Sequence, residues 1–269
     1  MLLAHLSDLH FGTEEPHIVA ALLDDLARAK PHLVVVTGDL TQRARAHQFE
    51  AARQFLDSIA APRLVVPGNH DIPLYNVTAR FLWPLAGYRR HIDENVEPTF
   101  ADNQVAIAGV NTARSNRGAE GRISLSDIER LRGFFSQQPH ATIKILAAHH
   151  PFIPPEREPT ATLVGRATQA LRMLAECGCH VILAGHLHHA YAGDVRTHHV
   201  EVERSILVIQ AGTAVSHRRR GEPNAYNLLT IENSRLTLQL RTFHGQKFIA
   251  GPQTTYDYAA NGWHIEPNA

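Results

Sequence analysis

The chain has 269 residues, enough to bury a large core as one domain. The chain has 26 basic and 26 acidic residues. This formal net charge of zero argues against binding to duplex nucleic acid, which depends mainly on neutralising phosphate charge. No apolar run approaches the roughly 18 residues of a membrane span, and no basic segment with a long apolar run opens the chain. We therefore expect neither a membrane span nor a signal peptide. Cys177 and Cys179, one residue apart, are expected to be free thiols in a cytoplasmic protein.

The first seventy residues alternate short apolar runs with amphipathic segments. Residues 2–6, 33–36 and 64–66 are apolar runs that predict buried strands. Residues 16–29 and 46–59 carry apolar side chains at helical spacing, and the first of these segments opens with a proline. This alternation predicts parallel strands joined by right-handed crossovers.

The middle of the chain continues the pattern after an interruption. Residues 72–100 lack clear periodicity and predict an irregular, partly helical excursion. We expect this excursion to cover a functional site at the strand ends. Ser124 followed by Asp127 is typical of a capping box that opens a helix. Further apolar runs predict strands at 105–110, 142–148 and 181–184, with a helix near 166–176.

The last third of the chain no longer alternates strands with helices. Four short segments, at 195–202, 205–210, 225–231 and 236–242, predict strands of a second, largely antiparallel sheet packed on the first. We expect a single domain over residues 1–250. Residues 251–269 are polar and punctuated by Gly and Pro, so we expect a loosely packed C-terminal tail.

Aspartate, asparagine and histidine residues follow five of the apolar runs. The motifs are Asp8-Leu9-His10, Gly38-Asp39, Gly68-Asn69-His70-Asp71, His149-His150-Pro151 and Gly185-His186-Leu187-His188. Because open α/β sheets keep their ligands at the carboxyl ends of strands, these motifs are expected to share one pocket. Carboxylate, amide and imidazole donors suit Mn, Fe, Zn or Co ions, and the unusual content of 19 histidines is consistent with such a role.

In this order the motifs resemble the calcineurin-like metallophosphoesterase superfamily over roughly residues 1–190. The opening of the chain and its length resemble the branch of class III cyclic nucleotide phosphodiesterases and glycerophosphodiesterases. The resemblance implies an α/β (α+β) fold, a four-layer αββα sandwich of two mixed β-sheets flanked by helices. It also implies two divalent or trivalent metal ions (Mn, Fe, Zn or Co). Asp8, His10 and His188 would hold one, Asn69, His149 and His186 the other, and Asp39 would bridge them.

The resemblance further implies a phosphodiester hydrolase in which a hydroxide shared by the metals attacks phosphorus. Cyclic nucleotides or other small phosphodiesters would be the substrates. His70 would hydrogen-bond a phosphate oxygen and protonate the leaving group. Asp71 would either orient that histidine or cap a helix, and His150 would support the site.

Other functions stay open on the same residues. A phosphomonoesterase or a nucleotide or lipid pyrophosphatase could use the same metal site. An inert binding scaffold is a further alternative, although all seven proposed ligand positions hold suitable residues. A homodimer is expected only by analogy with the branch.

Four positions are predicted to contact the substrate. Asn69 and His70 are expected to meet the phosphate. Arg114 follows a strand and has the planar guanidinium that suits phosphate, although such a residue is more often solvated. His217 with Arg218–Arg220 forms either a basic rim for an anionic substrate or a solvated turn.

Overall fold

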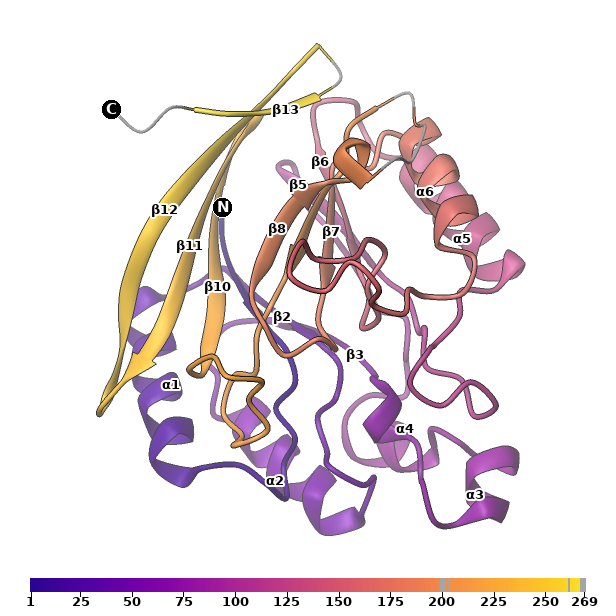
Figure 1. Ribbon diagram of the computed structural model, residues 1–269, viewed down its shortest axis with the longest axis vertical. Coiled ribbons are helices and arrows are strands. Elements are labelled where there is room, and N and C mark those ends of the chain that lie inside the picture. Colours follow the sequence, from indigo (N-terminus) through magenta and orange to yellow (C-terminus); the bar gives the residue numbers. More distant parts are fainter. Residues whose placement is uncertain (199–201, 203, 261, 267–269) are drawn as a thin grey trace.

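Two β-sheets pack face to face with helices on their outer sides (Figure 1). The computed structural model describes residues 1–198, 202, 204–260 and 262–266. The first sheet has the strand order β13-β12-β11-β10-β1-β2-β3 and the second has the order β4-β5-β6-β7-β9-β8. Both sheets are mixed, so the expected αββα sandwich is confirmed.

The strands of the first sheet are β1 (Leu2–Leu6), β2 (Leu33–Thr37), β3 (Arg63–Val66), β10 (Ala225–Glu232), β11 (Arg235–His244), β12 (Lys247–Ala259) and β13 (Gly262–Ile265). Those of the second are β4 (Thr99–Ala101), β5 (Val105–Gly109), β6 (Ile143–Ala147), β7 (Val181–Ala184), β8 (Tyr191–Asp194) and β9 (Leu207–Gln210). The α-helices are α1 (Pro16–Ala29), α2 (Ala46–Asp57), α3 (Val77–Leu82), α4 (Ala86–His91), α5 (Leu125–Ser136) and α6 (Ala167–Glu176). Short 3-10 helices cover Asn69–Asp71 and Val195–His198.

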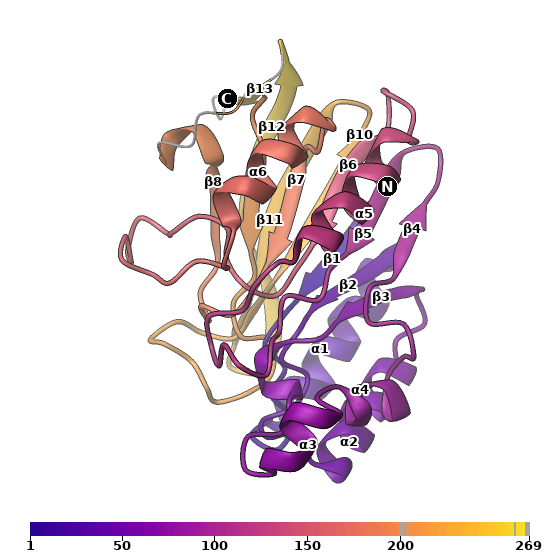
Figure 2. The ribbon, with the colours of Figure 1, turned by 90° about the vertical axis from the view of Figure 1, so that its right-hand side faces the viewer.

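The apolar runs form strands because both faces of each sheet are covered. In β2, Val34 and Val36 pack with α1 and α2, whereas Val35 points between the sheets. The second sheet is covered on its outer side by α5 and α6, which lie side by side in Figure 2. As expected, β1 runs parallel to β2 and β2 parallel to β3.

The expected origin of the second sheet was wrong. The second sheet consists of the strands β4 to β9 of the chain. The C-terminal strands β10 to β13 instead extend the first sheet. The junction is β10, which pairs antiparallel with the open edge of β1 and places Leu229 opposite Leu3. Side-chain periodicity shows which face of a strand is buried but does not reveal its neighbour, so the sequence pattern could not choose between the sheets.

Two segments differ locally from expectation. Residues 195–198 form a 3-10 helix rather than a strand, and residues 199–201 of that predicted strand lie outside the described residues. The described part of the expected loose tail is instead mostly strand, because 251–259 belong to β12 and 262–265 form β13. Tyr256 and Trp263 anchor these strands in the core between the sheets. The polar residues that suggested a tail occupy a strand with one face toward solvent.

The excursion at 72–100 contains α3 and α4. Tyr88 of α4 is fully buried and donates its hydroxyl to the carbonyl of Val65, 2.8 Å away. Arg80 of α3 donates to the carbonyls of Ser115 and Pro73. These contacts fix both helices against the ends of the sheets. Nowhere in the described part of the chain does a helix reach the length and apolarity needed to cross a membrane.

A buried ion pair ties α1 to the C-terminal strands. The Asp25 side chain is only 2% exposed and accepts hydrogen bonds from Arg241 (2.6 and 3.0 Å) and from the hydroxyl of Tyr226 (2.7 Å). Burial alone would raise the pKa of this carboxyl, but the bonds from Arg241 and Tyr226 outweigh burial and lower it.

Asp25→Ala should therefore lower the free energy of unfolding by about 3 kcal/mol, because the half-buried Arg241 is left without a carboxylate partner. Since the folded pKa lies below the unfolded value of about 4, the pair stabilises the fold above that pH and the contribution disappears as pH falls further. Urea unfolding at pH 7 and at acid pH measures both effects. Asp24→Ala, an exposed neighbour on the same helix, is the control. Equal losses in the two variants would contradict the prediction.

Candidate active site

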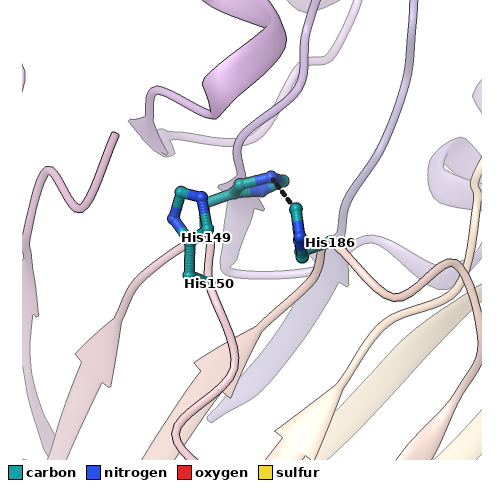
Figure 3. A group of neighbouring side chains, drawn as sticks. All are labelled: His149, His150 and His186. Carbon is teal, nitrogen blue, oxygen red and sulfur yellow. Dashed lines mark hydrogen bonds between the residues drawn. The ribbon is translucent and has the colours of Figure 1, made fainter. Parts of the chain in front are cut away.

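The five motifs lie in loops that follow β1, β2, β3, β6 and β7, and the structure brings these loops together. Backbone bonds join them: His10 donates to the carbonyl of Asp39 (2.9 Å), and Gly185 donates to that of His149 (3.0 Å). Figure 3 shows His149, His150 and His186 projecting from two such loops beside the strand ends. Parallel strands thus deliver side chains from distant parts of the sequence to one place.

One group of metal-type donors consists of Asp8, His10 and His188. Nε2 of His10 and Nε2 of His188 lie 3.6 and 3.7 Å from Oδ1 of Asp8. Oδ1 of Asp8 and both ring nitrogens of His10 are buried, and no hydrogen-bond partner for them occurs in the described residues. Buried polar atoms without partners are costly unless a bound group satisfies them, so this group fits a cation.

A second group consists of Asn69, His149 and His186. Oδ1 of Asn69 lies 3.1 Å from both Nε2 of His149 and Nδ1 of His186, and these two nitrogens are 3.2 Å apart. Donors that each lie about 2.0–2.2 Å from one ion are separated by roughly these distances. The second group therefore also fits a cation.

Asp39 lies between the two groups. Its Oδ2 is 3.6 Å from Nε2 of His10, and its Oδ1 is 3.4 Å from Nε2 of His149. Each carboxylate oxygen thus faces a different group, which is the position that a bridging ligand needs. The whole donor set, rich in imidazole and carboxylate without a thiolate, fits a pair of Mn, Fe, Zn or Co ions.

Hydrogen bonds orient two of the proposed ligands. Nδ1–H of His149 donates to the carbonyl of Thr37 (2.7 Å). The hydroxyl of Thr213 donates to the carbonyl of Arg218 and can accept from Nδ1–H of His188, 2.7 Å away. When these rings are neutral, Nε2 keeps a lone pair toward the site, as a metal ligand requires, and a bound metal would displace the second proton of His149.

Electrostatics also favour cations here. Burial alone would raise the pKa of Asp39, but His149 and His10 outweigh it and hold that pKa well below its usual range. Burial lowers the pKa of His186 to about 3 and that of His188 to about 4, which leaves both rings neutral. For His149, the carboxylate of Asp39 overcomes burial and raises the pKa to about 9. The two carboxylates thus favour positive charge where the donor atoms meet.

The backbone is held in an unusual conformation at this site. Five of the seven proposed ligands have positive φ values between 49° and 74°: Asp8, His10, Asp39, His186 and His188. Such values are uncommon outside glycine and cluster at functional sites. Glycines make room for the same loops, since a Cβ on Gly68 would collide with Asp39 and one on Gly185 with Ser7 and Asp8.

His70 lies beside the donor groups with both ring nitrogens engaged. Nδ1–H donates to the carbonyl of Gln42 (2.9 Å), so Nε2 can accept from Nη1 of Arg218, 3.0 Å away. Its backbone N–H donates to Oδ1 of Asp39 (2.8 Å). Burial lowers the pKa of His70, with Asp39 acting in the opposite direction. His70 therefore faces the site without the free nitrogen that His10 offers.

Asp71 and His150 support neighbouring loops. The carboxylate of Asp71 accepts backbone N–H bonds from Gly68, Leu40 and Thr41, which agrees with the capping role rather than with orientation of the His70 ring. Nδ1 of His150 lies 2.7 Å from the hydroxyl of Thr112, and its ring packs against those of His149 and His186. His149, not His150, is the ring that faces Asn69 and Asp39.

Two predicted substrate contacts lie elsewhere than expected. The guanidinium of Arg114 pairs with Asp127 at 2.7 Å and donates to the carbonyls of Asn111 and Ala113, so it secures the start of α5. His217 is exposed, and its backbone N–H donates to the carbonyl of Thr13. Their contact with substrate stays a prediction that no distance in the structure supports.

Sequence reasoning missed or underrated the arginines that do reach the site. Arg218, interpreted mainly as part of a solvated turn, contacts His70 and Oε1 of Gln42 (3.2 Å). Nη1 of Arg43 lies 3.2 Å from Nδ1 of His70. The position of Arg43, four residues after Asp39 in a motif loop, was the available signal.

Comparison with known proteins agrees with this geometry. The family model of the calcineurin-like phosphoesterases matches residues 1–190, and the chain belongs to that family. Members of the family hydrolyse phosphoesters at a dinuclear metal centre.

Two curated relatives carry phosphodiesterase names. Glycerophosphodiester phosphodiesterase GpdQ of Enterobacter lignolyticus is 37% identical over 26% of this chain and 30% of that protein. The probable cyclic nucleotide phosphodiesterase syc0937_d of a Synechococcus strain is 23% identical over 55% of this chain and 57% of its own length. The match thus spans less than two thirds of either relative.

Solved structures support the fold. Purple acid phosphatase PPD1 of yellow lupin (Lupinus luteus) superposes with a TM-score of 0.70 at 11% identity, covering 95% of this chain and 53% of that one. A dimetal phosphatase from Danio rerio gives a TM-score of 0.67 at 13% identity, covering 93% and 98%. At such identities these likenesses establish the fold alone.

Proposed function

We propose that this phosphoester hydrolase acts on small phosphodiesters, cyclic nucleotides among them, and that its metal ligands are the seven residues described above. The observation that carries the proposal is the complete donor set, in which Asp39 faces both groups and His70 stands beside them. Bound metals would supply an activated water and neutralise charge on the phosphate oxygens. The names of the two curated relatives support the choice of diesters.

The chain's own residues would handle the rest of the substrate. Asn69 and His70 lie at the edge of the donor groups, where a phosphate oxygen and the leaving oxygen would arrive. In its doubly protonated form His70 would give the proton of Nε2 to the leaving group, while Arg218, which lies beside that atom, would hold an anionic oxygen there. The hydrogen bond from Nδ1–H of His70 to the carbonyl of Gln42 keeps the ring in a fixed orientation.

A phosphomonoesterase is the second candidate, and one observation favours it. Arg43 and Arg218 both reach His70, and two guanidinium groups would suit the additional charge of a monoester. An inert scaffold would not need the strained and unpartnered donor atoms found here.

A rate comparison with Mn²⁺ present decides between the first two candidates. We expect kcat/KM for bis(p-nitrophenyl) phosphate to exceed that for p-nitrophenyl phosphate by tenfold or more, equivalent to about 1.4 kcal/mol of transition-state preference. Cyclic AMP and glycerophosphocholine, assayed alongside, would indicate the natural class. A faster monoester would overturn the diesterase proposal while leaving the metal site intact.

Three further expectations stay predictions: the limits of the single domain, a cytoplasmic location and a homodimer.

A further inference from the structure

A cavity of about 180 Å³ opens beside the proposed metal centre. Its walls include Asn69 and His70, which it shares with that centre, together with Gln42, Arg43, Leu74 and Arg80. The cavity is smaller than the roughly 300–1,000 Å³ of pockets that hold drug-sized ligands. A phosphate held near His70 would therefore have room here for a small substituent.

The cavity walls carry positive charge that no carboxylate balances. Its lining contains no Asp or Glu. Nη1 of Arg43 contacts the carbonyl of Gln42 at 3.1 Å, and its guanidinium lies 6.0 Å from the ring centre of Tyr75. Arg80 donates through Nε to the carbonyl of Ser115 (2.9 Å) and through Nη1 to that of Pro73 (3.2 Å). Carbonyls orient a guanidinium but leave its charge uncompensated.

Some other half-buried arginines of this chain are paired with carboxylates, whereas Arg122 and Arg166, which do not line this cavity, are not paired in the described part of the chain. Arg114 meets Asp127 at 2.7 Å, and Arg241 meets Asp25 at 2.6 Å. Within the described residues, Arg43 and Arg80 have no carboxylate oxygen within 4.0 Å. A third cation, Arg218, flanks His70 and bonds Gln42. The concentration of unpaired arginines at one cavity calls for an anion, because guanidinium groups bind carboxylates and phosphates best when water is partly excluded.

We propose that this cavity is a subsite for a second anionic group of the substrate, a carboxylate or a further phosphate, which Arg43 and Arg80 hold. The inference rests on the proposed function, since it assumes that a phosphoester occupies the centre next to His70. It narrows the substrate class to phosphoesters whose small substituent is negatively charged.

Equilibrium binding of two nearly isosteric probes tests the subsite. 2-Phosphoglycolate carries a carboxylate where ethyl phosphate carries a methyl group. By calorimetry on the full chain, we expect 2-phosphoglycolate to bind at least tenfold more tightly, both in Mn²⁺-loaded protein and after metal removal. Arg43→Met and Arg80→Met should each reduce this advantage to threefold or less. The exposed arginines Arg45 and Arg90 provide controls, and their Met variants should keep the full advantage.

Leu74→Glu gives an independent test that does not disturb the core. Leu74 lines the cavity but is 46% exposed, so a glutamate there should repel the carboxylate of 2-phosphoglycolate and weaken its binding at least tenfold. Val77→Glu, at an exposed position outside the lining, should have no such effect. The subsite is refuted if both probes bind wild-type protein equally, or if the advantage survives in Arg43→Met, Arg80→Met and Leu74→Glu.

The binding measurement is independent of catalysis. Selective binding in a protein that hydrolyses no ester would refute the proposed function and keep the anion site. Diester hydrolysis without selective binding would refute the anion site alone.

Discussion

Asp39→Asn is expected to lower kcat/KM for phosphoester hydrolysis by at least about 10³-fold, roughly 4 kcal/mol. The reason is that Asp39 is the only proposed ligand whose two oxygens face both donor groups, at 3.6 Å from His10 and 3.4 Å from His149. Asparagine keeps an oxygen for the backbone N–H of His70 and tolerates the positive φ of 53°. The substitution therefore removes charge with little change in shape.

Stability distinguishes a lost ligand from a damaged fold. Asp39 raises the pKa of Asp71, although burial is the larger cause of that shift to about 6. The lowered pKa of Asp39 means that its carboxylate stabilises the metal-free fold through His149 and His10, so Asp39→Asn should lose part of this stability while the protein stays folded. Asp24→Asn, an exposed substitution of the same kind, should change neither quantity. Near-normal activity in Asp39→Asn would contradict the bridging assignment.

His70→Ala is expected to lower kcat by about 10²–10⁴-fold while metal content stays unchanged. Both ring nitrogens of His70 are engaged, by the carbonyl of Gln42 and by Arg218, and we propose that the ring acts on substrate and not on a metal. Steady-state kinetics and elemental analysis of the same preparation give the two readouts.

The comparison for this variant is His47→Ala, which alters an exposed histidine of α2 and should preserve both readouts. If metal content in His70→Ala fell in proportion to activity, His70 would be a ligand, and the assignment of seven ligands would need revision.

The predictable part of this protein is the part encoded locally. The apolar run of β2 and the Ser124–Asp127 capping box of α5 give strand and helix directly, because periodicity and capping depend on neighbouring residues. The metal-type residues could be predicted as one group because each follows a strand. Parallel strands bring their carboxyl ends together whatever their separation in sequence.

The unpredicted part depends on contacts between distant segments. The pairing of β10 with β1 and the burial of Trp263 follow from which sheet edges are open, which no local pattern records. Arg114 and Arg218 both follow strands in polar loops, yet one pairs with Asp127 and the other reaches His70. Long side chains with several rotatable bonds take the partner that the tertiary structure offers, so their roles could not be assigned from sequence.

The most direct test of the account is the metal content of the full chain, purified without chelator and reconstituted with Mn²⁺. Elemental analysis should find two metal ions per chain in wild-type protein, with Asp39→Asn retaining one or fewer. Fewer than one ion per wild-type chain, not restored by Mn²⁺, would contradict the dinuclear centre and the hydrolytic function built on it.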